Sequence, residues 1–413
     1  MPNQNDKMSP PVKDSTMDFV VTGIAHVCNT FKRRAPGTQS ERDAQDFFAK
    51  ELDQWSDKVT VEDFSLRPAA FMGFFWISVI LAIAGSVTFF FNFFNPSVAL
   101  TIVSFVMLLL SMTMVFAEFF FYREFIDFLF PKAMSKNVYA VRKPKGEVKK
   151  HIIFGGHADA PWEFTYFLHG QVKALAPMFL GAIGGGIAGT ILVGIYLAMG
   201  TPPITGFWLF VAIFLLALIP FFISVLFFVN WNVICDGAND NLSACSASMA
   251  IMKELAENDT RFENTEVCCL ITGSEEAGLR GAKAFAKKHA KELKKVDTVF
   301  LPFEVLRETE HLTVYKRDLN GSVRCDKALV DLLLAAGNKV GVSMKCAPIP
   351  LGATDAAAFT QAGLRAACIC GSQDKPQTYY HTRHDTCDNI SPECIQTAIE
   401  IGYETAYMFD AGE

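Results

Sequence analysis

Two long stretches of the chain contain no charged residue. Residues 68–117 form a run of 50 residues without Asp, Glu, Lys or Arg, and residues 174–235 form a run of 62. Because one membrane-spanning helix needs about 20 apolar residues, each stretch is long enough for two helices and a turn. Asn95-Pro96 interrupts the first stretch, and Gly200 to Pro203 interrupts the second. The sequence therefore predicts two transmembrane hairpins, at 68–131 and 174–230, with helices near 73–94, 97–120, 175–199 and 204–230.

Composition agrees with membrane insertion. Hydrophobic residues make up 51% of the chain, and the mean hydropathy is +0.25. The alternative is two pairs of buried core helices, but runs of this length without a charge favour the membrane. Gly181, Gly185 and Gly189 form two overlapping GxxxG steps. This spacing is typical of closely packed membrane helices, although glycine is also simply common in such helices.

The flanking charges and the cysteines predict the compartment. No apolar stretch precedes Pro68, so no signal peptide is expected. Cys268, Cys269, Cys368 and Cys370 lie in apolar runs, which is typical of buried thiols in a reducing compartment. The hairpin turns carry no Lys or Arg, whereas the opposite ends carry many, which predicts that everything outside the hairpins, with both termini, is cytoplasmic. These cations are Arg67, Arg123, Lys132, Lys136, Arg142, Lys143, Lys145 and Lys173.

The rest of the chain alternates between strand and helix patterns. Residues 1–14 are predicted to be disordered, and residues 15–67, 132–173 and 231–413 to form one domain. Helices are expected at 40–55, 243–257, 282–293 and 391–410, and strands at 59–64, 137–141, 149–154, 267–272, 298–303, 313–316 and 365–370. This alternation predicts an α/β sheet covered by helices on both faces. The net charge of −6, with no dense basic cluster, argues against a nucleic-acid partner.

Histidines and acids follow the predicted strands. His157 and Asp159 come after strand 149–154, Glu275 and Glu276 after strand 267–272, and Glu304 after strand 298–303. Since ligands of α/β sheets bind at the carboxyl ends of the strands, these side chains are expected to meet at one edge. Asp240 precedes the helix at 243–257, and His381 and His384 follow the last strand. Imidazole and carboxylate without thiolate predict a site for zinc or a similar divalent ion.

Six motifs in order carry a family resemblance. They are GGHADA, GANDNLSA, GSEEAGLRGA, the acid of FLPFE, GATDAAAF and YYHTRHDT. Together they resemble the co-catalytic zinc peptidases of the M28 aminopeptidase type, which include glutamate carboxypeptidase relatives. The resemblance implies a mixed, mostly parallel sheet and two zinc ions, or another divalent ion. It implies the ligands His157, Asp240 (bridging), Glu276, Glu304 and His381, the general base Glu275, and supporting residues Asp159, Asp355 and His384. Glu304 stands where the family usually has Asp.

The resemblance implies a dizinc exopeptidase, of the aminopeptidase type, that hydrolyses a peptide or amide substrate with metal-activated water. The predicted hairpins add a membrane anchor and a substrate near the lipid bilayer. Taken alone, Glu275-Glu276 could be solvated acids at a helix N-terminus, and Asp240 could be a helix cap. Two other functions stay open: a non-catalytic membrane scaffold, which would bind no metal, and an acyl transferase like the single-zinc glutaminyl cyclases. Neither the terminus attacked nor the oligomeric state is indicated by the sequence.

Overall fold

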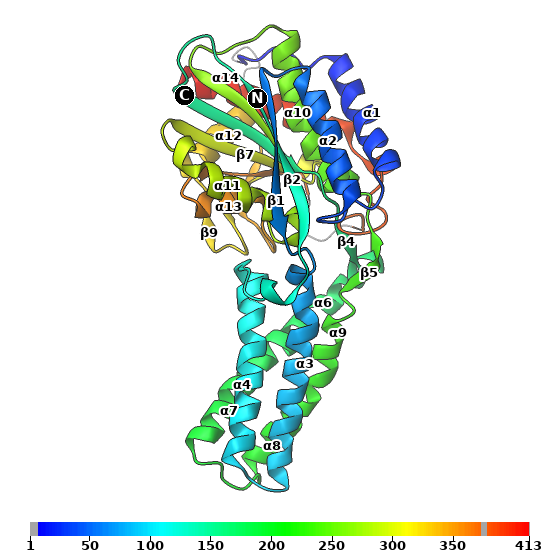
Figure 1. Ribbon diagram of the computed structural model, residues 1–413, viewed down its shortest axis with the longest axis vertical. Helices are drawn as coiled ribbons and strands as arrows, with labels where there is room; N and C mark the ends of the chain where they lie inside the picture. Colours follow the sequence, from blue (N-terminus) through cyan, green and yellow to red (C-terminus); the bar gives the residue numbers. More distant parts are fainter. Residues whose placement is uncertain (1–6, 373–377, 413) are drawn as a thin grey trace. The chain divides into compact units, whose positions relative to one another are not determined.

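The computed structural model describes residues 7–372 and 378–412, and the chain folds into two compact units (Figure 1). The sheet unit comprises Met1–Pro68, Lys132–Glu163 and Asn232–Glu413, and the helical unit comprises Ala69–Pro131 and Phe164–Trp231. The fold class is confirmed, because the sheet unit holds a mixed, largely parallel sheet and the helical unit holds four long apolar helices.

The sheet has its parallel strands at the centre. β6 (Thr265–Thr272), β3 (Lys150–His157) and β7 (Asp297–Glu304) are parallel neighbours in that order. β2 (Ala133–Arg142) and then β1 (Lys58–Leu66) continue it antiparallel on the β6 side. On the β7 side lie β12 (Ile369–Cys370), β8 (Thr313–Asp318) and β10 (Lys345–Pro348), with β11 (Arg365–Ala366) and β9 (Val323–Arg324) paired alongside. β4 (Trp162–Phe164) and β5 (Val229–Ile234) form a separate two-stranded sheet. The carboxyl ends of the three central strands consequently meet at one edge.

Helices cover both faces of this sheet, as predicted. Side chains of a strand alternate between faces. Ala140 of β2 joins the core that also contains Phe48, whereas its neighbour Tyr139 packs on Phe285, with ring centroids 5.0 Å apart. The first face carries α1 (Asp14–Thr30), α2 (Gln39–Asp53), α10 (Ser243–Glu257), α12 (Lys327–Lys339) and α14 (Pro392–Ala411). The second face carries α11 (Arg280–Leu293) and α13 (Asp355–Gln361).

Two expectations need correction. Disorder was expected for residues 1–14, of which 1–6 lie outside the described residues. Residues 7–13 are ordered, because the backbone N–H groups of Met8 and Ser9 donate to Glu404 and that of Lys13 donates to Glu254. The strand expected at 365–370 is two short strands instead. Both pair with β7, but only the second, β12, also pairs with β8, so the segment bends between them.

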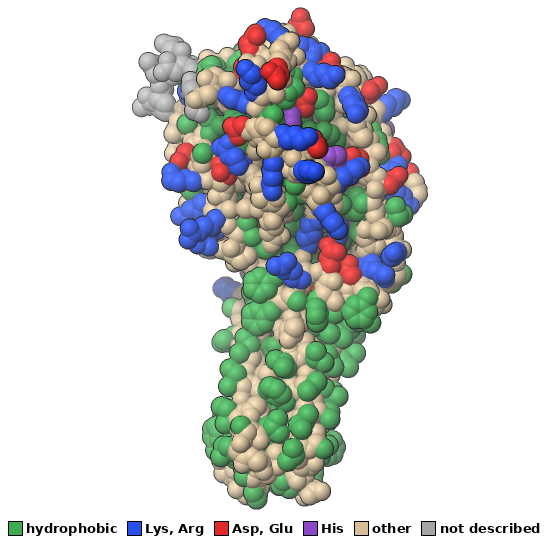
Figure 2. All heavy atoms as spheres, turned by 60° about the vertical axis from the view of Figure 1, so that its left-hand side comes forward, with side chains coloured by type: hydrophobic (Ala, Val, Ile, Leu, Met, Phe, Trp, Pro, Cys, Tyr) green, Lys and Arg blue, Asp and Glu red, His purple; other side chains and the backbone are tan. Residues whose placement is uncertain are grey.

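The helical unit contains four helices long and apolar enough to cross a membrane. They span Ala70–Phe93, Val98–Phe120, Leu175–Ala198 and Phe207–Val225, close to the predicted positions. The regular helices within them are α3 (Ala70–Phe90), α4 (Val98–Met114), α6 (Leu175–Phe179), α7 (Gly186–Ala198), α8 (Phe207–Ala217) and α9 (Ile219–Val225). The short helix α5 (Thr165–Leu168) lies between α4 and α6 in the chain. Their outer surface is apolar, with Ile80 and Phe210 more than half exposed (Figure 2). An exposed surface of this kind supports membrane association.

Small and polar residues hold the four apolar helices together. Ser78 and Ser111 bridge α3 and α4 with hydroxyl oxygens 2.9 Å apart, and the Ser104 hydroxyl donates to the Gly85 carbonyl over 2.7 Å. On α7, a Cβ atom at Gly189 would lie 2.5 Å from Leu215 Cδ2 of α8. A Cβ atom at Gly181 would lie equally close to Phe221, and one at Gly185 equally close to Leu218. Of the two interpretations of the GxxxG steps, the structure favours close helix approach over the mere abundance of glycine.

A bulky residue at Gly189 is expected to loosen this packing. Gly189→Ile should destabilise the helical unit by about 1–3 kcal/mol, the usual cost of overpacking a tight interface. Gly184→Ile is the matched control, because a Cβ atom there meets only Leu180, at 3.4 Å. The midpoint of unfolding in mixed detergent micelles measures both variants. Equal midpoints would contradict the packing argument.

Candidate metal centre

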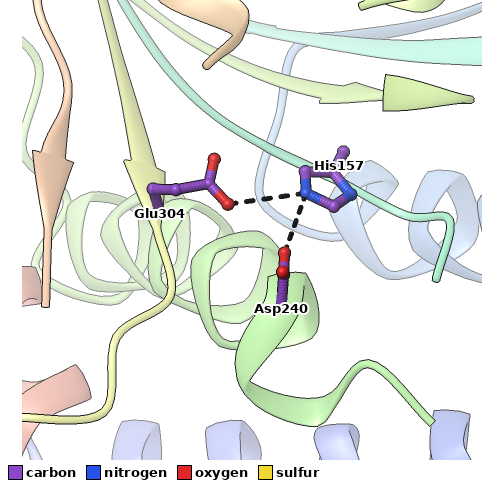
Figure 3. Close-up of side chains that lie close together, drawn as sticks. All are labelled: His157, Asp240 and Glu304. Carbon is purple, nitrogen blue, oxygen red and sulfur yellow. Dashed lines mark ion pairs between the residues drawn. The ribbon is translucent and has the colours of Figure 1, made fainter. Parts of the chain in front are cut away.

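Asp240 lies between two histidines and presents one carboxylate oxygen to each. Its Oδ1 is 3.2 Å from His157 Nε2, and its Oδ2 is 3.1 Å from His381 Nε2. Each histidine has a second carboxylate beside it. Glu304 Oε1 is 3.6 Å from His157 Nε2, and Glu276 Oε1 is 3.4 Å from His381 Nε2. Figure 3 shows the imidazole of His157 facing both Asp240 and Glu304. The five predicted ligands therefore lie together.

These side chains form groups with the spacing of metal ligands. His157, Asp240 and Glu304 make one group and Asp240, Glu276 and His381 another, each with its ligand atoms within 4.8 Å of one another. A third such group, His157, Glu275 and Glu276, includes the predicted general base. The first two groups share Asp240, which presents one carboxylate oxygen to each histidine.

The sheet explains why these residues meet. His157 is the last residue of β3, Glu304 is the last of β7, and Glu275 and Glu276 follow β6 within four residues. His157 pairs in register with Thr272, the last residue of β6. Asp240 lies in the turn before α10, which approaches β3 closely because Gly156 has no side chain. A Cβ atom there would be 2.7 Å from the backbone nitrogen of Cys245.

The chemistry of the cluster fits divalent cations. Within residues 7–372 and 378–412, both ring nitrogens of His157 and Oδ1 of Asp240 make no well-formed hydrogen bond, although all three are buried. Burial, with neighbouring carboxylates, raises the pKa of Glu275 and Glu276 well above the usual range and that of Glu304 to about 8. Burial opposes ionisation of Asp240 too, but the two histidines hold its pKa below the usual range. Buried acids with unpartnered ligand atoms are suited to coordinating metal.

Asp159 supports both the histidine and the glutamates. Its two carboxylate oxygens accept from the backbone N–H groups of Glu275 over 2.9 Å and Glu276 over 3.0 Å. Its Oδ1 also lies 3.4 Å from His157 Nδ1. The family resemblance implied a supporting role for Asp159. The bonds to the glutamate turn show a second contact that residue spacing did not indicate.

Glu41 of α2, which no sequence motif indicated, also holds this turn. It accepts hydrogen bonds from the backbone N–H of Ser274 over 2.6 Å, the Ser274 hydroxyl over 2.8 Å and the Gly37 N–H over 2.7 Å. Ser274 has a left-handed φ of 54°, which is costly for a residue with a side chain. Burial, with Asp159 nearby, raises the pKa of Glu41 to about 8. Glu41 thus stabilises the strained residue that precedes Glu275.

Removal of Glu41 is expected to destabilise the sheet unit. Glu41→Ala leaves buried donors without an acceptor, which should lower the free energy of unfolding by about 3 kcal/mol. Glu41→Gln keeps one acceptor oxygen, so it should lower the free energy of unfolding by a smaller amount. Asp43→Ala, on the exposed side of the same helix, should change little. Thermal unfolding compares the three variants, and equal losses for Glu41→Ala and Asp43→Ala would refute this role.

Further residues outside the predicted set fix the Asp240 turn. Asp385 accepts from the backbone N–H groups of Asn239 over 2.7 Å and Asp240 over 3.1 Å. Arg34, which is 1% exposed, donates to the carbonyls of Ala158 over 3.0 Å and Asp236 over 2.5 Å. Arg34 therefore joins the chain after His157 to the chain before Asp240. Neither contact follows a local sequence pattern, since each pairs a side chain with distant backbone.

The remaining predicted residues differ in their placement. Asp355 is buried at the start of α13 and accepts a 2.5 Å hydrogen bond from the Thr272 hydroxyl at the end of β6. His384 is exposed and belongs to none of the three ligand groups among the described residues. Tyr380, whose ring lies 4.3 Å from that of His381, was not predicted. Burial and the acids of the cluster raise the pKa of its phenol, so it stays a hydrogen-bond donor.

Comparison with known proteins identifies a related family. Residues 225–406 match the model of Peptidase family M28. This segment contains Asp240, Glu275, Glu276, Glu304 and His381, and His157 lies before it. None of the curated protein sequences matches the chain.

Solved structures share the fold. A zinc aminopeptidase from Bacillus subtilis has a TM-score of 0.57 at 12% identity, covering 97% of this chain and 96% of its own. An aminopeptidase from Aneurinibacillus sp. strain AM-1 has a TM-score of 0.55 at 12% identity, covering 95% and 93%. A glutaminyl cyclase from an Acidobacteriales bacterium has a TM-score of 0.56 at 13% identity, covering 98% of both chains. At such identities the likeness shows a common fold, which aminopeptidases and cyclases both use.

Proposed function

Because residues 225–406 belong to Peptidase family M28, we propose that this metallopeptidase is a membrane-anchored dizinc exopeptidase that removes amino-terminal residues. The observation that carries the proposal is the position of Asp240, which offers one oxygen to a His157–Glu304 group and the other to a His381–Glu276 group. A shared carboxylate of this kind suits two ions held side by side. The four apolar helices support the anchor.

The residues divide into ligands and a base. We assign His157, Asp240 and Glu304 to one ion and Asp240, Glu276 and His381 to the other. When bound, such a pair of zinc ions would polarise a substrate carbonyl and lower the pKa of water. Glu275, whose Oε2 is 3.8 Å from His157 Nε2, takes a proton from the attacking water and returns it to the leaving amine. Asp159 and Glu41 keep the turn that carries Glu275 in place.

Charge favours a substrate with a free amino group. The charged groups that act most strongly on Glu275, Glu276 and Glu304 are His157 and other carboxylates. A site for a terminal carboxylate would need a cation such as arginine. An excess of carboxylates around a site instead attracts an ammonium group. An aminopeptidase is therefore favoured over a carboxypeptidase.

A second candidate function is acyl transfer, and the ligand groups support it. The group of Asp240, Glu276 and His381 could hold a single ion by itself, and the glutaminyl cyclase fold is as similar as the aminopeptidase folds. The alternative is an acyl transferase that cyclises an amino-terminal residue. Such an enzyme would contain one zinc ion per chain and would release ammonia or water without cleaving the peptide.

Substrate cleavage tests the proposal directly. Detergent-solubilised protein with added zinc should release the first residue from peptides with a free amino terminus, whether or not the carboxyl terminus is amidated. Peptides with an acetylated amino terminus are the matched controls and should stay intact. Cleavage of acetylated peptides at the same rate would contradict an aminopeptidase, and the absence of release from every peptide would contradict an exopeptidase.

A further inference from the structure

The loop that carries His381 is tied to a fully buried glutamate. Glu163 of β4 is 0% exposed, and its carboxylate accepts from Arg383 Nε and Nη2, each over 2.6 Å. It also accepts from the backbone N–H of Arg383 over 3.2 Å. Three hydrogen bonds to one carboxylate fix both the side chain and the backbone of Arg383. A paired arginine fork of this type is among the stronger polar contacts in proteins.

His381, two residues before Arg383, has a strained backbone. Its φ is 51°, in the left-handed region that residues with side chains adopt at a cost of about 1–2 kcal/mol. Strain of this kind persists only where surrounding contacts impose it. With this backbone, His381 Nε2 lies 3.1 Å from Asp240 and 3.4 Å from Glu276.

The other end of the loop is fixed separately. Asp385 binds the backbone N–H groups of Asn239 and Asp240. The segment from His381 to Asp385 is therefore held at two points, by Glu163 at Arg383 and by the Asp240 turn at Asp385. The second contact sets the distance between the loop and Asp240. The first holds the middle of the segment, beside His381.

We propose that Glu163 is a positioning residue for His381. Its hydrogen bonds to Arg383 impose the backbone conformation that places the imidazole of His381 next to Asp240 and Glu276. This inference rests on the proposed function, in which His381 is a metal ligand. Glu163 does not touch the ligand atoms and acts through Arg383. It is also the last residue of the sheet unit before the chain enters the helical unit.

The test compares Glu163→Gln with the corresponding substitution in a second arginine–carboxylate pair of similar geometry. Arg261 binds Asp57 through two hydrogen bonds of 2.7 and 2.8 Å, away from the ligand groups, so Asp57→Asn is the matched control. The full chain is solubilised, and the affinity for each zinc ion is measured by competition with a chelator. Glu163→Gln should lower the affinity for one of the two zinc ions about 10–100-fold, which is the usual effect of losing a partner that orients a ligand. Asp57→Asn should leave both affinities unchanged.

Two further readouts separate positioning from a general structural role. Cobalt in place of zinc should give an altered visible spectrum in Glu163→Gln, and kcat should fall while KM stays within about twofold. The double variant with Arg383→Gln should bind zinc no more weakly than Glu163→Gln, because both changes remove the same contact. If Glu163→Gln does not fold, Arg383→Lys removes the fork but keeps the charge and should weaken the same ion to a smaller extent.

Several results would overturn the inference. They are wild-type zinc affinities and cobalt spectra in Glu163→Gln, equal weakening in Asp57→Asn, or a change confined to KM, which would assign Arg383 to substrate binding. A wild-type protein that binds no zinc would instead refute the proposed function. The two failures are therefore distinguishable.

Discussion

Glu275→Gln is expected to lower kcat by about 1,000-fold while the protein keeps its metal ions, since loss of a general base typically costs 10²–10⁴-fold. Glutamine has the shape of glutamate but cannot accept the proton of the attacking water. The turn should stay intact, because Asp159 and Glu41 bind its backbone and not the side chain of Glu275. Initial rates with a free amino-terminal peptide, and metal content by elemental analysis, give the two measurements.

The neighbouring glutamate supplies the contrast. Glu276→Gln changes the same chemical group one residue later, but it should remove a ligand and thus lower metal content together with activity. Glu292→Gln, at the exposed end of α11, should alter neither quantity. The geometry allows one specific contradiction, because Glu275 also lies in a ligand-like group with His157 and Glu276. Loss of an ion in Glu275→Gln would make Glu275 a ligand and leave the base unassigned.

The sequence predicted the cluster because of how parallel strands are arranged. His157, Glu275, Glu276 and Glu304 each end or follow a buried strand, and neighbouring parallel strands bring their carboxyl ends to one edge. The rule needs only the order of strands and polar residues along the chain. The four long apolar helices were predictable for a similar reason, since a long charge-free run leaves few other structures.

The residues that hold the cluster in place were not predictable in the same way. Glu41, Glu163, Arg34 and Asp385 bind backbone groups that are distant in sequence, and any acid or arginine on a helix or loop has the same local appearance. Their partners depend on how α2, β4 and the final loop pack, which hydrophobic periodicity does not specify. Such positioning contacts can therefore be identified only in the folded structure.

Two missed helices had local signals. In α1 the buried residues Val20, Ile24 and Val27 repeat at helical spacing, and in α12 Asp326 caps the first turn by accepting from the Leu329 N–H over 2.8 Å. Both patterns are typical of helices and are visible in the sequence. By contrast, the bend between β11 and β12 has no such signal, because it depends on which neighbouring strand each half meets.

Zinc is expected to bind with a stoichiometry of two per chain, and its removal should destabilise the sheet unit. Asp240, Glu275, Glu276 and Glu304 are crowded carboxylates in a buried site, so without cations they repel one another or take up protons. A ligand that binds only the folded state stabilises it by about 2.7 kcal/mol for each site at 100 times its Kd. Chelation should therefore lower the unfolding temperature by several degrees, and zinc should restore it.

Asp240→Asn tests the shared position most directly, because both ligand groups lose a charged ligand at once. The variant should retain less than one ion per chain, lose activity and show little response of its unfolding temperature to zinc. Asp236→Asn, four residues earlier, is the matched control, since it removes an equal charge from the same segment without touching either group. A single ion in the wild-type protein, bound equally well by Asp240→Asn, would exclude the bridging role of Asp240. The cyclase-like alternative would be favoured by a single ion whose binding depends on Asp240, Glu276 and His381 but not on His157 or Glu304. Only the second ligand group would then bind metal.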